Sequence, residues 1–373
     1  MSNVEADPQE TVCASNPERG RFSAGLRDGV TVERCEAGIV EILEPRKVPL
    51  GGPRAMTVLR TLPQRARSLI GAWCFVDSFG PDDVARTGGM KVARHPHTGL
   101  ATVSWLFEGS IDHLDSAGHW ATVRPGEVNL MNAGRGITHS EFSSAQTTTL
   151  HGLQLWYALP EAARFSEPDL DSFRPDTIRG QGYEALVFLG SLLGQSSPVR
   201  TALPLTGAEL RLEPHTEIQI TVPEDHEHGL VQVSGPVWVN DVPVTQNAIG
   251  FVPTGHRSIR ISAGAEPALA LLIGGEPLNE QIVMWWNFVG RSHEEIVRWR
   301  NRYMREMGFE NGGEDESERG APGSFTSASA SMDEAGSDPA EEQPRLQFGH
   351  FPPDTPAPLP APEVPHTRLK LRG

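Results

Sequence analysis

The sequence predicts an all-β protein with two domains of similar size. Between residues 36 and about 300, short apolar runs such as TVSWLFEG, LHGLQLWYALP and GLVQVSGPVWVND alternate with glycine and proline. Short, regularly spaced strands separated by turn signals are typical of a β-sandwich or β-barrel. A polar, turn-rich stretch at residues 168–185 divides this region into two halves.

The predicted boundaries follow these changes in composition. Residues 1–35 are polar, and we expect them to form a flexible, weakly structured arm. We place the first β-domain at residues 36–170 and the second at residues 171–291, because the turn-rich stretch lies between them.

A single clear helix is predicted at residues 292–309. Ser292 is a suitable N-cap, and Glu295, three residues later, completes a capping box. The helical period gives this segment one apolar face, formed by Ile296, Trp299, Tyr303 and Met307.

Residues 310–373 are predicted to be a disordered tail. Residues 311–343 hold nine acidic residues and one basic residue among many Ser, Ala and Gly, and such a segment cannot bury a core. Residues 344–365 are rich in proline and suit an extended polyproline II conformation. The spacing of Pro353 and Pro356 fits a recognition motif for a protein partner, although a plain spacer is favoured. We expect the β-domains to stay folded without the tail.

Composition argues against several classes of function. The formal net charge is −16, half of it in the acidic part of the tail, and no basic stripe indicates nucleic-acid binding. No apolar run approaches the roughly 18 residues of a membrane helix, and the N-terminus lacks the apolar core of a secretory signal. Cys13, Cys35 and Cys74 match neither a disulfide framework nor a zinc site, so a reducing cytoplasm is the expected location.

The stretch ARHPHTGL contains two histidines, His95 and His97, in an otherwise strand-like region. Residues i and i+2 of a strand face the same side, so both rings can point inward together. That arrangement suits a metal ion, but a lone pair of this kind also occurs without one.

A second pair, His139 and Glu141, stands about forty residues downstream in RPGEVNLMNAGRGITHSEF. Gly134 and Gly136 permit tight turns just before it. If the two pairs lie on adjacent antiparallel strands, three imidazoles and one carboxylate converge. This donor set suits Fe(II), Mn(II), Ni(II), Cu(II) or Zn(II) and leaves open positions on an octahedral ion.

The segments HPHTGL, RPGEVNLMNAGRGITHSE, LHGLQLWYALP and GGEPLNEQIVMWWNFVGRSHEEI resemble the pirin family of the cupin superfamily, and the similarity covers roughly residues 35–305. The resemblance implies a bicupin: two stacked β-barrels with one mononuclear metal, usually iron, in the first. The family's metal ligands correspond to His95, His97, His139 and Glu141. One departure is Ala101, because many cupins carry a glutamate four residues after the second histidine.

Other candidate residues have plainer interpretations. His226 and His228 imitate the first pair in the second domain, but His256 downstream has no acid two residues later, so we expect no metal there. His113 could belong to the site or lie in a solvated turn. For His151 we expect a structural hydrogen bond. We favour packing within the barrel as the role of Trp105, Phe107 and Trp156. Phe75, Val76 and Met131 are candidates for lining the pocket.

Three hypotheses follow for function. The resemblance implies a dioxygenase acting on flavonol-type or other chelating aromatic substrates, with Glu141 dissociating from the metal or acting as a base. It also implies an alternative, a redox-sensing regulator that acts through protein partners without turnover. The third hypothesis is a metal-bearing or vestigial β-scaffold.

Overall fold

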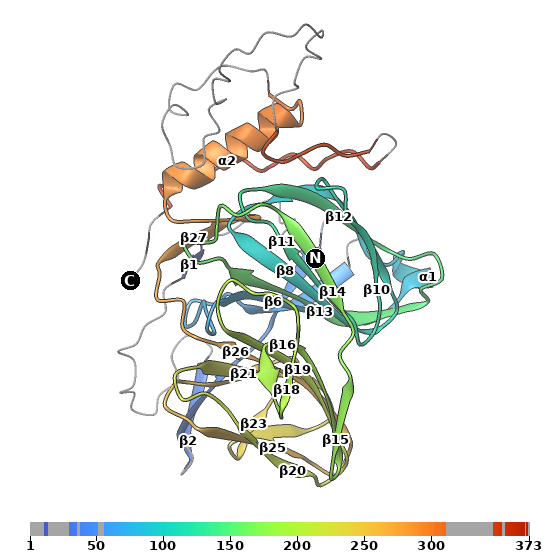
Figure 1. Cartoon of the computed structure of the whole chain (residues 1–373), viewed down its shortest axis with the longest axis vertical. Helices are drawn as coiled ribbons and strands as arrows, with labels where there is room; N and C mark the ends of the chain where they lie inside the picture. The colour runs from blue at the N-terminus through green and yellow to red at the C-terminus, as the bar shows by residue number, and fades with distance from the viewer. Residues whose placement is uncertain are drawn as a thin grey trace, which may run out of the picture.

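The computed structural model describes residues 11–13, 30–35, 38–50, 56–310, 346–352, 355–369 and 371. Within these residues two β-barrels are stacked along the long axis of the molecule, and a helix lies across the outer end of the first barrel (Figure 1). The predicted all-β fold, with two barrel domains and a C-terminal helix, is confirmed.

Two facing sheets form the first barrel in the described part of the chain. The smaller has the strand order β10 (Trp120–Val123), β9 (Ile111–Asp115), β12 (Ile137–Ser143), β7 (Lys91–His97). The larger has the order β14 (Asp169–Phe173), β11 (Val128–Asn132), β8 (Leu100–Glu108), β13 (Thr149–Ala158), β6 (Trp73–Asp83), β5 (Met56–Leu62), β4 (Arg46–Leu50). The short helix α1 (Val84–Thr87) follows β6. The strands pair antiparallel. Because successive side chains of a pleated strand point to opposite faces, every second residue points into the barrel.

The second barrel repeats this plan. Its larger sheet has the order β15 (Thr177–Gly180), β16 (Tyr183–Leu189), β19 (Leu205–Leu212), β26 (Ala268–Gly275), β21 (Glu227–Ser234), β24 (Ile249–Val252), β3 (Gly38–Leu43), β2 (Val30–Cys35). Its smaller sheet has the order β20 (Glu217–Thr221), β25 (Ser258–Ala263), β22 (Val237–Val239), β23 (Val242–Val244). A hairpin of β17 (Ser191–Leu192) and β18 (Gln195–Ser196) follows β16.

The N-terminal strands correct two predicted boundaries. β2 lies within the predicted flexible arm and β3 within the predicted first domain, yet both belong to the second barrel, where β3 pairs with β24. Val40 and Ile42 of β3 enter the core of that barrel. This burial comes from a strand far away in the sequence, which local composition cannot reveal.

The chain also returns from the second barrel to the first. β27 (Ile282–Trp285) and β28 (Phe288–Gly290) pair with each other, and β1 (Thr11–Cys13) pairs with β27. The Val289 N–H donates to the Thr98 carbonyl, next to the strand that carries the first histidine pair. Residues 282–290, predicted in the second domain, therefore close the first barrel. β14 likewise extends the first barrel to Phe173.

Apolar side chains from both barrels form one cluster at their interface. Trp105 stacks on Phe188 with ring centroids 4.3 Å apart, and its indole N–H donates to Glu209 at 2.7 Å. The Trp73 indole N–H donates to the Gly274 carbonyl at 2.9 Å. Trp105 is thus a packing residue, as predicted.

The C-terminal helix, α2 (His293–Glu306), begins as predicted at the N-cap Ser292, whose side chain accepts from the Glu295 N–H. The Glu295 carboxylate accepts from the Arg291 N–H at 2.7 Å. The buried face contains Ile296, Trp299, Tyr303 and Met304. Met304 joins the predicted apolar face, and Met307, the C-cap of the helix, packs partly buried against the same cluster.

The prediction that residues 310–373 are disordered is wrong for residues 346–352 and 355–369. Phe348, Ala361 and Leu369 are buried in a cluster with α2 and β28. The Tyr303 hydroxyl donates to the Leu359 carbonyl at 2.6 Å. An extended, proline-rich segment can pack through a few buried apolar residues when neighbouring side chains supply its hydrogen bonds. Those few residues hardly change the average composition of the segment, so the composition did not predict the packing. Residues 311–345, which include the acidic segment 311–343, lie outside the described residues.

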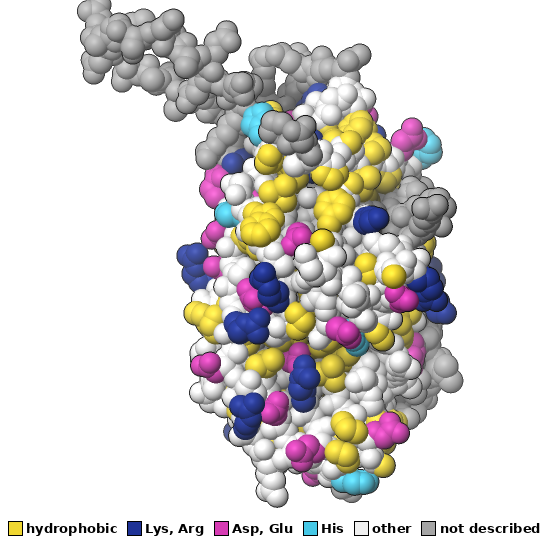
Figure 2. Space-filling model, turned by 90° about the vertical axis from the view of Figure 1, so that its right-hand side faces the viewer, with side chains coloured by type: hydrophobic (Ala, Val, Ile, Leu, Met, Phe, Trp, Pro, Cys, Tyr) yellow, Lys and Arg dark blue, Asp and Glu magenta, His cyan; other side chains and the backbone are white. Residues whose placement is uncertain are grey.

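The described helices are all too short or too polar to span a membrane. On the face drawn in Figure 2, basic and acidic side chains are intermixed and do not form a continuous basic surface.

Candidate metal centre

Two neighbouring strands of the first barrel carry the predicted ligands. His95 and His97 lie on β7, and His139 and Glu141 lie on β12. The strands pair antiparallel with His139 opposite His95, as the sequence interpretation required. The preceding turn depends on Gly134, which has φ +48°, and a Cβ there would lie 2.0 Å from the Ser166 carbonyl oxygen.

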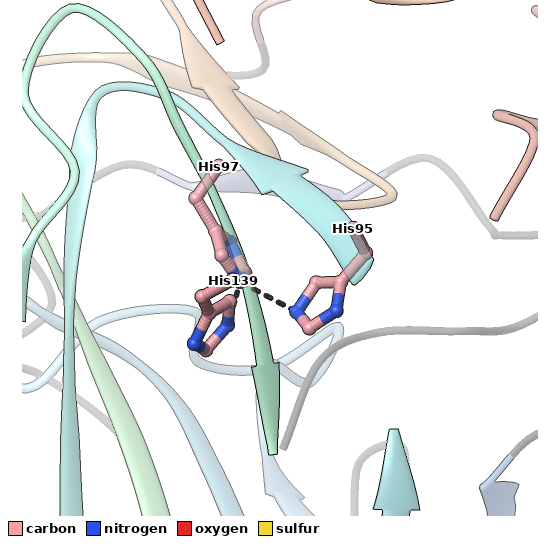
Figure 3. Close-up of side chains that lie close together, drawn as sticks. All are labelled: His95, His97 and His139. Atoms are coloured by element: carbon pink, nitrogen blue, oxygen red, sulfur yellow. Dashed lines mark hydrogen bonds between the residues drawn. The ribbon is translucent and has the colours of Figure 1, made fainter. Parts of the chain in front are cut away.

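The three imidazoles converge in the barrel interior (Figure 3). The His97 Nε2 atom lies 3.1 Å from His95 Nε2 and 3.1 Å from His139 Nε2. Nitrogens bound to one ion at about 2.1 Å and at right angles lie about 3.0 Å apart. The two distances from His97 therefore fit adjacent ligand positions of one metal ion, and the ligand atoms of all three imidazoles lie within 4.8 Å of one another.

Burial keeps these imidazoles neutral. Removal from water lowers the pKa of His95 to about 4 and lowers the pKa of His97 and His139 well below the usual range. A neutral imidazole has the free lone pair that a metal requires. The site is therefore ready to bind a cation at neutral pH without first losing protons.

Glu141 is buried but does not form one compact set with all three imidazoles. The Glu141 carboxylate instead lies close to His139 and His113. One ligand atom from each of these three residues lies within 4.8 Å of the other two. The pairing of β12 with β7 shifts register between His139 and Glu141, which places Glu141 opposite Val92. The Ser104 hydroxyl lies 3.4 Å from Glu141 Oε1.

His113 is the important residue that sequence reasoning left undecided. It is a buried residue of β9 and not a solvated turn residue, and its Nδ1 lies 3.4 Å from His139 Nδ1. Its Nε2 lies 3.2 Å from Asp115 Oδ2. Burial opposes ionisation of Asp115, but hydrogen bonds from the His113 side chain and from the His119 backbone bring its pKa below the ordinary value. The available signal was the alternation of His113 and Asp115 on a strand.

Aromatic rings lie beside the imidazoles. The Trp156 ring meets the His97 ring edge to face at 5.1 Å, and Phe75 stacks on Trp156 at 3.9 Å. Val76 lies in the cluster between the barrels, and Met131 is buried in a small cluster at the end of β11. Ala101 belongs to the interface cluster as well.

The remaining aromatic and histidine candidates have packing contacts. Phe107 is partly buried against the interface cluster and meets the His151 ring at 5.0 Å. The pKa of His151 is lowered by burial.

The histidines of the second barrel are arranged differently. His228 lies at the start of β21, which pairs with β24 and β26 and so corresponds to β8, not to the ligand strand β7. The His226 and His228 ring centroids are 6.1 Å apart, and His256 Nδ1 lies 3.0 Å from the Pro253 carbonyl. Among the described residues, the groups of three side chains that could hold a metal ion lie in the first barrel.

Comparisons with known proteins agree with this architecture. The family model described as Pirin matches residues 55–157, and the Pirin C-terminal cupin domain matches residues 207–309. A Pseudomonas aeruginosa protein with the provisional name quercetin 2,3-dioxygenase is 37% identical over 281 residues, covering 72% of this chain and 88% of that protein. Human Pirin is 31% identical over 224 residues, covering 57% and 74%.

Solved structures show the same fold. A quercetin 2,3-dioxygenase from Acinetobacter baumannii superposes with a TM-score of 0.74 at 30% identity, covering 89% of this chain and 98% of that one. The bacterial pirin YhhW from Escherichia coli, solved with nickel(II), superposes with a TM-score of 0.51 at 18% identity, covering 64% and 99%.

Proposed function

Because this chain belongs to the pirin family of bicupins, we propose that it is a metal-dependent dioxygenase acting on flavonol-type or other chelating aromatic substrates. The observation that carries the proposal is the convergence of three neutral, buried imidazoles, in which His97 Nε2 lies 3.1 Å from the Nε2 atoms of both His95 and His139. The names of the relatives from Pseudomonas aeruginosa and Acinetobacter baumannii support the substrate class.

His95, His97 and His139 would hold one divalent ion, and Glu141 is the fourth ligand that we propose. Fe(II) is the ion we favour, and Ni(II), Mn(II), Cu(II) and Zn(II) suit the same donors. When bound, the ion supplies open coordination positions for a chelating substrate and the one-electron chemistry that O2 requires.

The protein's own side chains supply orientation and a proton acceptor. The rigid strands β7 and β12 fix the three imidazoles, and the stacked rings of Trp156 and Phe75 offer an aromatic wall beside His97. Glu141 is buried near His139, so its carboxylate is placed to take a proton from a hydroxyl group of the substrate.

The test compares metal content and turnover in one set of proteins. The parent, loaded with Fe(II) without oxygen, is mixed with quercetin and air, and substrate loss and O2 uptake are recorded together. His97→Ala should lose metal and turnover, whereas the matched change His226→Ala in the second barrel should keep both.

The outcomes separate the hypotheses. If the parent holds metal but consumes neither quercetin nor related catechol-like compounds, the dioxygenase proposal is rejected, which leaves the redox-sensing regulator and the scaffold without turnover. A pull-down with ferrous and with ferric protein then distinguishes that regulator from a scaffold without turnover.

A further inference from the structure

Each imidazole that binds a cation through Nε2 must carry its proton on Nδ1, because Nε2 has to keep its lone pair. His95 satisfies this requirement through the backbone. Its Nδ1 lies 2.8 Å from the Ala93 carbonyl oxygen, which can only accept a hydrogen bond. The proton of His95 is therefore held on the side away from the metal position.

His139 depends on another side chain for the same purpose. Its Nδ1 lies 3.4 Å from His113 Nδ1, and two ring nitrogens share a hydrogen bond only if one of them is unprotonated. When His139 donates, His113 must carry its own proton on Nε2. That nitrogen lies 3.2 Å from Asp115 Oδ2, a carboxylate oxygen that accepts it.

The orientation of Asp115 is fixed by the backbone. Its Oδ1 accepts from the Ala117 N–H at 2.9 Å and from the His119 N–H at 3.1 Å. Its Oδ2 faces His113 and also lies 3.0 Å from His119 Nδ1. The carboxylate is fully buried and cannot turn without breaking these bonds.

We propose that Asp115 and His113 are positioning residues that set the tautomer of His139 and so keep its Nε2 lone pair directed at the metal position. The inference rests on the proposed function only in that His139 is a metal ligand. A metal-binding histidine commonly donates its second ring N–H to a neighbouring acceptor, and that hydrogen bond fixes the orientation and the tautomer of the ring. Here an imidazole separates ligand and carboxylate, so both histidines change tautomer together.

Asp115→Asn tests this coupling because it reverses the direction of donation. The amide oxygen must stay where Oδ1 is, facing two backbone N–H groups, so the amide nitrogen takes the place of Oδ2. It then donates to His113 Nε2, which leaves the proton of His113 on Nδ1. His113 in turn donates to His139, whose proton moves to Nε2.

The first readout is the tautomer itself in metal-free protein, measured from the ring ¹⁵N shifts of His139. The parent should show the proton on Nδ1 and Asp115→Asn the proton on Nε2. The matched control is Asp112→Asn on the same strand, where the carboxylate accepts from the Thr122 hydroxyl at 2.8 Å. It should leave the parent tautomer unchanged.

The second readout is affinity for Ni(II) and Zn(II), by titration calorimetry. Asp115→Asn should bind about 10–100-fold more weakly than the parent and the Asp112→Asn control. His113→Gln, whose amide oxygen can accept from His139, should recover most of the affinity that His113→Leu loses. This second pair keeps the test decisive if Asp115→Asn does not fold.

A proton on Nε2 of His139 in the metal-free parent would overturn the inference. So would an Asp115→Asn variant that keeps the parent tautomer and affinity, or equal affinities for His113→Gln and His113→Leu. A parent protein with the expected tautomer but without metal affinity would instead reject the proposed function and leave the coupling intact.

Discussion

At the proposed metal centre, the physical chemistry of single side chains decides what can bind. Burial of His95, His97 and His139 disfavours their charged forms, so the neutral forms prevail and their lone pairs stay available. Glu141 differs because it brings negative charge to a poorly solvated interior. The four residues should therefore respond unequally to substitution.

We predict that His97→Ala and His139→Ala lose most bound metal, whereas Glu141→Gln keeps a measurable fraction. Imidazoles hold a borderline metal better than a lone carboxylate does. Glu141→Gln should nevertheless lose turnover, because the amide neither binds as an anion nor takes a proton. Elemental analysis and O2 uptake on the same samples measure both effects. Turnover of Glu141→Gln at the parent rate would exclude the carboxylate from the chemistry.

In the second barrel, His228 predicts a dependence of stability on pH. Burial, with smaller contributions from His226 and His256, lowers its pKa to about 4, below the usual 6.5. The unfolded chain then binds more protons than the folded one between these values, so stability falls as pH drops from 6.5 toward 4. The loss attributable to His228 should reach about 3 kcal/mol at pH 4.

Chemical denaturation of the parent and of His228→Gln at pH 7 and pH 4 measures this loss. The free energy of unfolding of the variant should vary less with pH than that of the parent. An identical pH dependence in both proteins would show that His228 protonates freely in the folded state.

Among the elements, α2 and the proline-rich segment stabilise each other. Phe348 is fully buried, its ring lies 5.4 Å from Tyr303 and 6.2 Å from Phe288, and its carbonyl accepts from the Thr138 hydroxyl beside His139. This segment therefore backs the sheet that carries the ligands. The expectation that the tail is dispensable does not agree with these contacts.

We predict that Phe348→Ala lowers the free energy of unfolding by about 3–5 kcal/mol, the usual range for a buried phenylalanine. His350→Ala, an exposed position two residues later, should change it by less than about 0.5 kcal/mol. Ending the chain at residue 310 should lower the melting temperature at least as much as Phe348→Ala. Equal melting temperatures for the parent and the shortened chain would mean that the segment does not pack in solution.

Strand existence was predictable from the sequence, but strand partners were not. Alternating apolar residues and turn glycines mark β7, β8, β12 and β13, and the i, i+2 spacing predicted that His95 and His97 share one face of a strand. The assignment of β3 to the second barrel depends on pairing across two hundred residues. The place of His113 beside His139 was not predictable for a similar reason, because it depends on the pairing of β12 with β9.

At the scale of the whole molecule, the two barrels form one packed unit. Trp105 crosses the interface to reach Glu209, and the Glu227 carboxylate accepts from the Gly71 N–H at 2.7 Å. Arg67 lies over the Phe251 ring at 3.5 Å. The second barrel thus supports the wall of the first barrel that lies opposite the ligand strands.

We predict that the barrels unfold in a single transition. Trp105→Phe removes the indole N–H and leaves Glu209 with one fewer donor, which should cost about 1–3 kcal/mol and lower the midpoint without splitting it. Tryptophan fluorescence and far-ultraviolet circular dichroism report on it together. Two separate transitions in the parent would show that the barrels are independent.

Metal content, measured on the purified protein and its variants after dialysis against Fe(II) or Ni(II), decides whether the first barrel holds an ion. The parent and His226→Ala should each hold about one ion per chain, and His139→Ala should hold nearly none. A parent without metal, or a His139→Ala variant with as much metal as the parent, would contradict a metal centre built on the imidazoles of the first barrel.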